Sequence, residues 1–245
     1  MRLTVLGCQS PYPGPNGATP GYLLQTDQSN ILLDCGSGVI SQLMKHLPLV
    51  ELDAVCLSHY HHDHVADIGV LQYGIMLHQR LKDRTKGVLP VYGPANIEER
   101  GLKLTYQEAT VHQEIRENSV IQIKDVQISF HRTQHDIPCY AMRIEYQGRV
   151  LVYGADSGPK TNWDFARDAD LFICEGTFLE RFKPQGPTGH LSIIQASQIA
   201  QELQAKKLMI THLFPAYKLE EIRAEMQGFT YGEKLIAEIG LQLQI

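Results

Sequence analysis

Apolar residues along the chain fall into short runs separated by turn-forming residues, a pattern that predicts alternating strands and helices. Three such runs, at residues 3–7, 21–26 and 31–34, predict an opening meander of strands. The turn-rich segment from Pro11 to Gly17 separates the first two runs. Residues 39–46 then predict a helix. The chain is therefore expected to begin as a small sheet followed by a helix.

The middle of the chain continues this alternation. Residues 52–58 predict a short buried strand, and a helix is expected from Asp67 onward, over residues 68–81. Residues 88–92 predict the next strand. Pro94-Ala95-Asn96 indicate the start of another helix, because proline is favoured in a first helical turn and acidic residues follow closely.

The second half predicts a comparable set of elements. Strands are expected at residues 121–132, 139–146, 149–153, 171–174 and 207–211, with two short strand-like runs at 234–239 and 241–245. Helices are expected between Tyr153 and Leu171 and at residues 192–203. Two halves of mixed strands flanked by helices predict an α/β fold, a four-layer α/β/β/α sandwich.

Size and composition limit the possible functions. The 245 residues are 43% hydrophobic, and because no linker or low-complexity stretch divides them, residues 1–245 are expected to form a single domain. The net charge of −5, with no long run of Lys or Arg, gives no electrostatic footprint for tight binding to duplex nucleic acid.

The sequence also predicts the cellular compartment. No apolar run reaches the roughly 20 residues of a membrane span, and residues 1–7 resemble a strand rather than a signal peptide. We therefore expect a cytoplasmic protein without a membrane partner. The five cysteines lack a paired Cys-x-x-Cys motif and are expected to be reduced and buried: Cys8, Cys35, Cys56, Cys139 and Cys174.

The most informative motif is the run His59-Tyr60-His61-His62-Asp63-His64. With 11 His in 245 residues, the spacing His-x-His-x-Asp-His arises by chance in roughly one such chain in a thousand. Three imidazoles and a carboxylate at this spacing can hold two metal ions side by side. The run follows the strand predicted at residues 52–58, which places it in a loop at a strand end. The motif therefore predicts a metallohydrolase rather than a surface patch of histidines.

A site for two metals needs further ligands, and three later strands supply candidates at their ends. His135 follows residues 128–130, Asp156 follows 152–154, and His212 follows 209–211. One metal would be held by His59, His61 and His135, the second by Asp63, His64 and His212, and Asp156 would bridge both. Two metals about 3.5–4 Å apart activate a shared hydroxide for displacement at phosphorus.

These segments together resemble the metallo-β-lactamase-fold hydrolases, and within that superfamily the ribonuclease Z-like phosphodiesterases. Besides the histidine run, the resemblance rests on residues 33–38, 135–143, 153–157, 174–178, 189–192 and 210–212. It implies the ligand set above, a pair of divalent ions with Zn²⁺ favoured and Mn²⁺ as the alternative, a phosphodiester or nucleotide substrate, and a homodimer. His190, backed by Glu175, matches the position that assists the scissile phosphate or the leaving group. Alternatively, residues 189–192 simply start a helix, with Ser192 as its N-cap.

One departure from the family favours a small substrate. Ribonuclease Z enzymes that process tRNA carry a long Gly/Pro-rich arm, in many of them between the positions of His135 and Asp156. Here these residues are only 156 − 135 = 21 positions apart. The spacing is similar to that of phosphoribosyl cyclic-phosphate phosphodiesterases, which favours a small or cyclic phosphodiester over tRNA. True β-lactamases often carry Cys where Asp156 stands, which argues against lactam chemistry.

The expected mechanism is attack of a metal-bridging hydroxide on phosphorus, with Asp63 orienting or deprotonating the water and His190 assisting the leaving oxygen. Asp34 and Asp67 are candidates to orient metal-binding histidines, although either residue also suits a turn or cap. His62 is expected to point away from the site. Three alternatives stay open: a ribonuclease Z-like endonuclease acting at RNA 3′ ends, a thioester or lactone hydrolase, and a metal-binding protein without catalysis.

Overall fold

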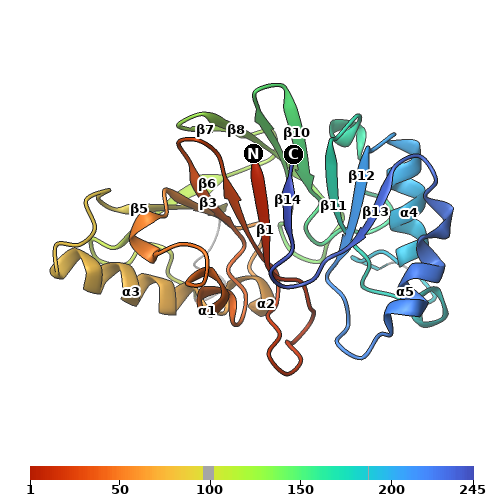
Figure 1. The fold of residues 1–245 in the computed structure, drawn as a ribbon, viewed down its shortest axis with the longest axis horizontal. Coiled ribbons are helices and arrows are strands. Elements are labelled where there is room, and N and C mark those ends of the chain that lie inside the picture. The colour runs from red at the N-terminus through yellow and green to blue at the C-terminus, as the bar shows by residue number, and fades with distance from the viewer. Residues whose placement is uncertain (96–101, 187) are drawn as a thin grey trace.

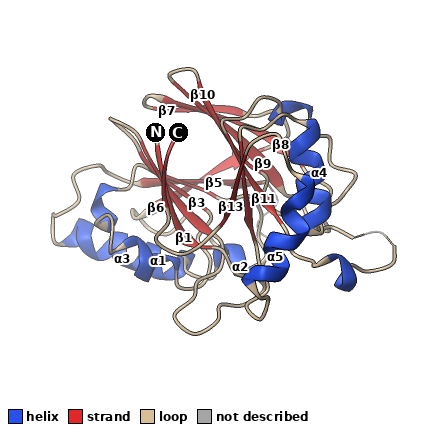
Figure 2. Ribbon diagram, turned by 45° about the vertical axis from the view of Figure 1, so that its right-hand side comes forward, coloured by secondary structure: helices blue, strands red, loops and turns tan. Residues whose placement is uncertain are grey.

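The computed structural model describes residues 1–95, 102–186 and 188–245. Two seven-stranded sheets face each other, and helices cover their outer surfaces (Figure 1). Helices α1 (Val39–Leu43) and α3 (Ile68–Arg80) lie on one side, and α4 (Ile193–Glu202) and α5 (Leu219–Glu225) on the other (Figure 2). This arrangement confirms the predicted α/β/β/α sandwich.

The first sheet combines the meander at the start of the chain with parallel strands. Its order is β14-β1-β2-β3-β4-β5-β6, with antiparallel pairing up to β3 and parallel pairing from β3 to β6. The strands are β1 (Arg2–Gly7), β2 (Gly21–Gln25), β3 (Asn30–Leu33), β4 (Ala54–Cys56), β5 (Leu89–Pro94), β6 (Thr110–Ile115) and β14 (Gln242–Gln244). The last strand of the chain therefore pairs with the first.

The second sheet has the same plan, with the order β13-β12-β11-β10-β9-β8-β7. Strands β7 to β10 pair antiparallel, and β10 to β13 pair parallel. The strands are β7 (Val120–Ile123), β8 (Val126–Arg132), β9 (Tyr140–Tyr146), β10 (Arg149–Tyr153), β11 (Leu171–Glu175), β12 (Lys207–Thr211) and β13 (Glu233–Ile236). Strands β8, β10 and β12 consequently end at the same edge of this sheet.

Both faces of the sheets are buried, which explains the nearly continuous apolar runs of the sequence. Alternate residues of β2 divide between two cores: Leu24 packs between the sheets, and Leu23 packs beneath the helices. A third core joins β11 and β12 to α4 and includes Phe172. Helix α4 begins with a capping box in which Ser192 and Gln195 exchange hydrogen bonds.

The remaining helical segments are short. Helix α2 (His62–Val65) forms a single turn within the histidine run, and the described residues also form 3₁₀ turns at Leu49–Glu51, Asp164–Ala166, Glu180–Phe182 and Met226–Gly228. Within the described residues, no helix is both long enough and apolar enough to cross a membrane. All five cysteines are free and buried, as expected.

Several local predictions need correction. The helix expected between Tyr153 and Leu171 is only the turn Asp164–Ala166, because Gly158 and Pro159 interrupt the segment. The single strand expected at residues 121–132 is a hairpin of β7 and β8, and Lys124 at its turn has a φ of 50°. Strand β6 and helix α5 were not predicted.

The predictions at residues 94–96 and at the end of the chain have different outcomes. Pro94 ends β5 instead of starting a helix, and the helix expected from Asn96 lies outside the described residues. The two strand-like runs at the end of the chain form strands β13 and β14, but each joins a different sheet. Residues 9 and 213 form an isolated parallel bridge that ties the loop after β1 to the end of β12.

The core between the sheets supports a stability prediction. Phe130 on β8 is fully buried there, so Phe130→Ala should lower the free energy of unfolding by about 3–5 kcal/mol, measured by urea titration. Val120 on the edge strand β7 is 59% exposed, and Val120→Ala should cost about 0.5 kcal/mol or less. Equal losses for the two variants would contradict the placement of the main core between the sheets.

Candidate metal centre

The predicted metal ligands all lie at strand ends on one side of the sandwich. They come from four segments: the loop and short helix after β4 (His59, His61, Asp63 and His64), and the loops after β8 (His135), β10 (Asp156) and β12 (His212). Because parallel strands end at a common edge, residues far apart in sequence meet there. The structure therefore brings together every ligand that the sequence predicts.

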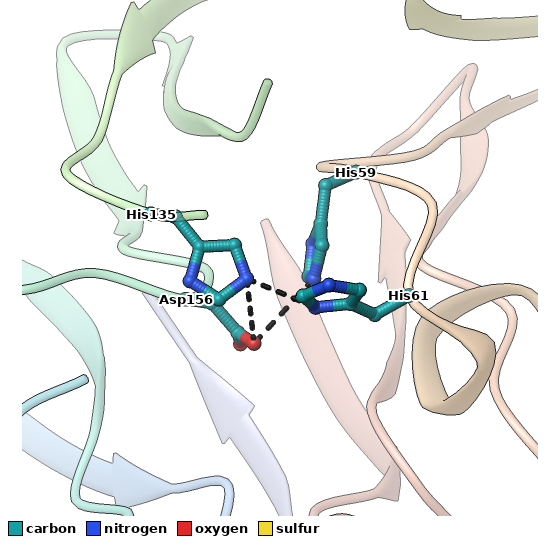
Figure 3. Close-up of side chains that lie close together, drawn as sticks. All are labelled: His59, His61, His135 and Asp156. Carbon is teal, nitrogen blue, oxygen red and sulfur yellow. Dashed lines mark hydrogen bonds and ion pairs between the residues drawn. The ribbon is translucent and has the colours of Figure 1, made fainter. Parts of the chain in front are cut away.

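The first group contains His59, His61, His135 and Asp156, whose potential ligand atoms lie within 4.8 Å of one another. Figure 3 shows these four side chains pointing toward a common centre. The Nε2 atom of His135 is 2.9 Å from Nδ1 of His61. The Oδ2 atom of Asp156 is 3.4 Å from Nε2 of His59 and 3.7 Å from Nε2 of His135. Three imidazoles and one carboxylate oxygen thus surround one point.

The second group contains Asp63, His64 and His212. The Nε2 atoms of His64 and His212 are 3.3 Å apart, and Oδ2 of Asp63 is 3.4 Å from Nε2 of His212. The other oxygen of Asp156, Oδ1, lies 3.2 Å from Nε2 of both histidines. Asp156 therefore turns one oxygen toward each group, which is the arrangement of a bridging carboxylate.

The donors fit divalent cations. Asp156 is 2% exposed, and both its Oδ1 atom and Nε2 of His59 are buried without a hydrogen-bond partner among the described residues. Buried polar atoms of this kind are costly unless a partner satisfies them. Nitrogen and carboxylate donors in sets of three or four are the ligands that Zn²⁺ and Mn²⁺ take. Cations in both groups would satisfy these atoms.

The pKa shifts of the residues in the site also favour bound cations. Burial lowers the pKa of His59 to about 3, and His64 lowers it as well, so this imidazole is neutral. Burial acts to raise the pKa of Asp156, but His212, His64 and His59 hold it well below its usual value. Burial also opposes the charging of His64, yet Asp156 and Asp34 raise its pKa well above the usual value. Ionised carboxylates thus draw positive charge into a buried space.

Asp34 organises the site from outside the two groups. Its Oδ2 accepts hydrogen bonds from Nδ1 of His64 (2.7 Å), from Oγ of Ser58 (2.8 Å) and from the hydroxyl of Tyr153 (2.6 Å). Its Oδ1 accepts from the backbone N–H of Ser58 at 2.7 Å. The contact with His64 matches the expected orienting role. Asp67 instead accepts from the backbone N–H of Ile40 and so caps the start of α1.

His190 and Glu175 lie beside the two groups, as predicted. The Nδ1 atom of His190 is 3.0 Å from Oε1 of Glu175 and 3.9 Å from Oδ2 of Asp156. Burial opposes the charging of His190, but Glu175 raises its pKa to about 9. The alternative interpretation of this segment is confirmed, because Ser192 is the N-cap of α4, while the catalytic role of His190 stays a prediction.

Gly189 precedes this histidine and has a steric reason to be glycine. Its carbonyl oxygen is 3.0 Å from Nδ1 of His135. A Cβ atom at this position would approach the same nitrogen to 2.8 Å, which is closer than van der Waals contact allows. The glycine therefore lets the backbone hold the imidazole of His135 in place.

Three residues near the site adopt left-handed backbone conformations. Asp34, Ala155 and His212 have φ angles of 54°, 50° and 60°, and each lies just beyond the end of a strand. Such angles are unfavourable for residues other than glycine and are maintained only where the surroundings fix them. Here they turn the chain sharply, so that the side chains of Asp34, Asp156 and His212 face inward.

Sequence reasoning missed three hydroxyl groups. Ser10 donates to Oδ2 of Asp63 at 2.9 Å, which brings the start of the turn-rich loop to the site. Ser58 contacts Nδ1 of His59 at 3.0 Å, and Thr177 contacts Nδ1 of His212 at 2.8 Å. Serine and threonine are common at turns, so only the position of Ser58 before the histidine run could have singled one out. His62 is exposed, as expected.

Comparison with known proteins shows similarity over nearly the whole chain. The profile described as Beta-lactamase superfamily domain matches residues 29–213. The chain is 39% identical over 243 residues to the probable metallo-hydrolase YhfI of Bacillus subtilis, covering 98% of each protein. The crystal structure of YhfI, a metallo-beta-lactamase fold protein, aligns with a TM-score of 0.90 and 37% identity, covering 99% of this chain and 98% of YhfI.

More distant relatives cover the chain equally well. Ribonuclease Z of Methanopyrus kandleri is 23% identical over 282 residues, covering 100% of this chain and 98% of that protein. The crystal structure of a diphosphatase from the PhnP family shares the fold, with a TM-score of 0.78 and 19% identity, covering 100% of this chain and 97% of the diphosphatase. The chain therefore belongs to the metallo-β-lactamase superfamily.

Proposed function

We propose that this protein is a metal-dependent phosphodiesterase that holds two divalent ions and acts on a small or cyclic phosphodiester. The observation that carries the proposal is the carboxylate of Asp156, which turns one oxygen toward each of two histidine groups. The first ion would be held by His59, His61 and His135, the second by Asp63, His64 and His212, with Asp156 shared. Zn²⁺ is favoured by the many imidazoles, and Mn²⁺ is the alternative.

When bound, the two ions supply positive charge to phosphoryl oxygens and lower the pKa of a coordinated water. The protein's own groups complete the chemistry. Asp63 accepts a hydrogen bond from Ser10, and His212 and His64 hold its pKa well below the usual value despite burial. Its carboxylate therefore stays ionised, which suits it to bind the second ion and to orient the attacking water by accepting a hydrogen bond from it.

His190 is placed to assist the leaving group. Glu175 fixes Nδ1 of the imidazole, Nε2 has no hydrogen-bond partner within the part of the chain that the structure describes, and the side chain is 25% exposed. Rings of His190 and His212 stack with centroids 5.4 Å apart, so the imidazole borders the second metal group. A histidine held in this way can donate a hydrogen bond or a proton to a departing oxygen.

The segment between His135 and Asp156 supports a small substrate. Strands β9 and β10 fill most of these 21 positions, with a tight turn at Gln147 and Gly148 between them. No length remains there for an arm that grips tRNA. The similarity to ribonuclease Z of Methanopyrus kandleri keeps RNA 3′ ends as the second candidate substrate. Thioester or lactone hydrolysis would use the same residues and is distinguished by substrate preference.

We propose that residues 1–245 form one domain, because β14 pairs with β1 and every strand among the described residues belongs to one of two facing sheets. A homodimer and a cytoplasmic location stay predictions from the sequence.

Replacing the shared ligand tests the proposal directly. Asp156→Ala should abolish hydrolysis of bis(p-nitrophenyl) phosphate in Zn²⁺ or Mn²⁺, because both metal groups lose an oxygen ligand. Removal of a residue that only hydrogen-bonds a metal ligand lowers activity by roughly 10–100-fold. We expect the loss of activity in Asp156→Ala to be larger, because the ligand itself is removed. Asp156→Asn, which keeps the shape but not the charge, is the matched control and should retain part of the metal content. Full activity of the alanine variant would refute the proposal. Metal-loaded wild-type protein without any turnover would favour ester, thioester or lactone substrates or a binding role.

Removing His190 should separate catalysis from metal binding. His190→Ala should keep both ions and lower kcat by about 10²–10⁴-fold for a cyclic nucleotide, whose alkoxide leaving group needs a proton. The loss should be smaller for bis(p-nitrophenyl) phosphate, because p-nitrophenolate leaves without protonation. Equal losses for the two substrates would assign His190 to phosphate binding instead of leaving-group assistance.

Metal removal should destabilise the protein. Each ion that binds only the folded state at 100 times its Kd contributes about 2.7 kcal/mol, so two ions contribute about 5.4 kcal/mol, which corresponds to a rise in Tm of about 11–22 °C for a chain of this length. We expect dialysis against a chelator to lower Tm by this amount and added Zn²⁺ to restore it, as followed by circular dichroism. Asp156→Ala should show little response. An unchanged Tm in the wild-type protein would argue against bound metal.

A further inference from the structure

Thr177 lies between Glu175 and a metal-group histidine. Its hydroxyl donates to Oε2 of Glu175, and the hydroxyl oxygen is 2.8 Å from Nδ1 of His212. The residue follows strand β11 and is half-buried. The hydroxyl of Tyr217 donates to the carbonyl oxygen of Thr177 at 3.1 Å, which fixes the backbone of this loop.

The direction of the hydrogen bonds follows from the groups around Glu175. Backbone N–H groups of Ser157 and Leu191 donate to its two oxygens, at 2.6 and 3.1 Å. Four donors therefore converge on one carboxylate when Thr177 and His190 are included. An ionised carboxylate only accepts hydrogen bonds, so the single proton of the Thr177 hydroxyl points to Glu175.

This direction determines which nitrogen of His212 carries a proton. A hydroxyl whose proton is used can only accept from Nδ1 of the imidazole, so Nδ1 bears the hydrogen. The neutral ring then presents the lone pair of Nε2, which lies 3.2 Å from Asp156 and 3.4 Å from Asp63. That tautomer is the one needed to bind a metal at this position.

We propose that Thr177 is a positioning residue that passes the influence of Glu175 to His212 and keeps its Nε2 atom ready to bind a metal. The inference rests on the proposed function, because it concerns the same metal centre. It assigns Glu175 two tasks. One oxygen holds His190 at 3.0 Å, and the other acts on His212 through the hydroxyl.

The same pattern occurs a second time, in the first metal group. The Ser58 hydroxyl donates to Oδ2 of Asp34 at 2.8 Å, and its oxygen lies 3.0 Å from Nδ1 of His59. A carboxylate, a hydroxyl and an imidazole thus follow one another at both groups. His64 and His135 bond an acceptor directly through Nδ1, at 2.7 and 3.0 Å. In each of four histidines, Nδ1 is held by an oxygen atom and Nε2 is left to face the centre: His59, His64, His135 and His212.

The experiment compares Thr177→Val, which keeps the shape and removes the hydroxyl, with Thr177→Ser, which keeps the hydroxyl. Metal content after dialysis and the Kd of each Zn²⁺ ion, from competition with a chromophoric chelator, are measured for the full chain. We expect Thr177→Val to bind one of the two ions about 10–100-fold more weakly and the other unchanged. Thr177→Ser should stay within about threefold of the wild type. Activity of the valine variant should recover as Zn²⁺ is raised.

A matched control removes a similar hydroxyl elsewhere. Thr26 also donates to a carboxylate, that of Asp125 at 2.8 Å, and lies in the loop after β2. Thr26→Val should leave both Zn²⁺ affinities unchanged, and the Tm of all metal-free variants shows whether they are folded.

Two outcomes would overturn the inference. One is unchanged binding of both ions by Thr177→Val, and the other is equal weakening by the serine and valine variants, which would indicate a packing role. Wild-type protein that binds no Zn²⁺ at all would instead refute the proposed function itself.

Discussion

The rest of the structure depends on one constraint, which is the burial of a charged carboxylate, that of Asp156. Asp156 is 2% exposed and lies where two apolar sheets meet, so its charge must be balanced inside the protein. Histidines from both sheets surround it, and Asp156 and Asp34 together raise the pKa of His64 well above its usual value, so positive charge is drawn toward the carboxylate. The surrounding groups therefore favour positive charge at this place, and their imidazole and carboxylate donors suit divalent ions.

The two sheets hold these groups in place because buried hydrogen bonds link the sheets close to the site. Tyr153 at the end of β10 donates across the interface to Asp34 at the end of β3. Tyr22 on β2 and Thr211 on β12 share a second hydrogen bond between the sheets, at 2.5 Å. The rings of the two tyrosines are 5.1 Å apart. These buried polar contacts fix the separation of the sheets, and with it the distance between ligands that come from different halves of the chain.

The candidate ligands could be found in the sequence because each follows a strand that an apolar run makes visible. His135, Asp156 and His212 are ordinary residues by type, and only their place after such runs distinguishes them. The hydroxyl contacts of Ser10 and Thr177 could not be predicted, because they depend on how loops fold in three dimensions. The hairpin within residues 121–132 was missed for a related reason, since a single Lys124-Asp125 turn interrupts an otherwise continuous strand pattern. Local patterns thus located the site, while long-range packing determined its fine structure.

The order of the candidate ligands along the chain also determines which group of donors is complete first during synthesis of the protein. All four residues of the first group have been synthesised once Asp156 is added, but the second group waits for His212, 212 − 156 = 56 residues later. The bridge between residues 9 and 213 and the pairing of β14 with β1 come later still. A chain that ends between Asp156 and His212 therefore contains every donor of the first group but lacks one donor of the second. The second group of donors is therefore complete only after the C-terminal part of the protein has been synthesised.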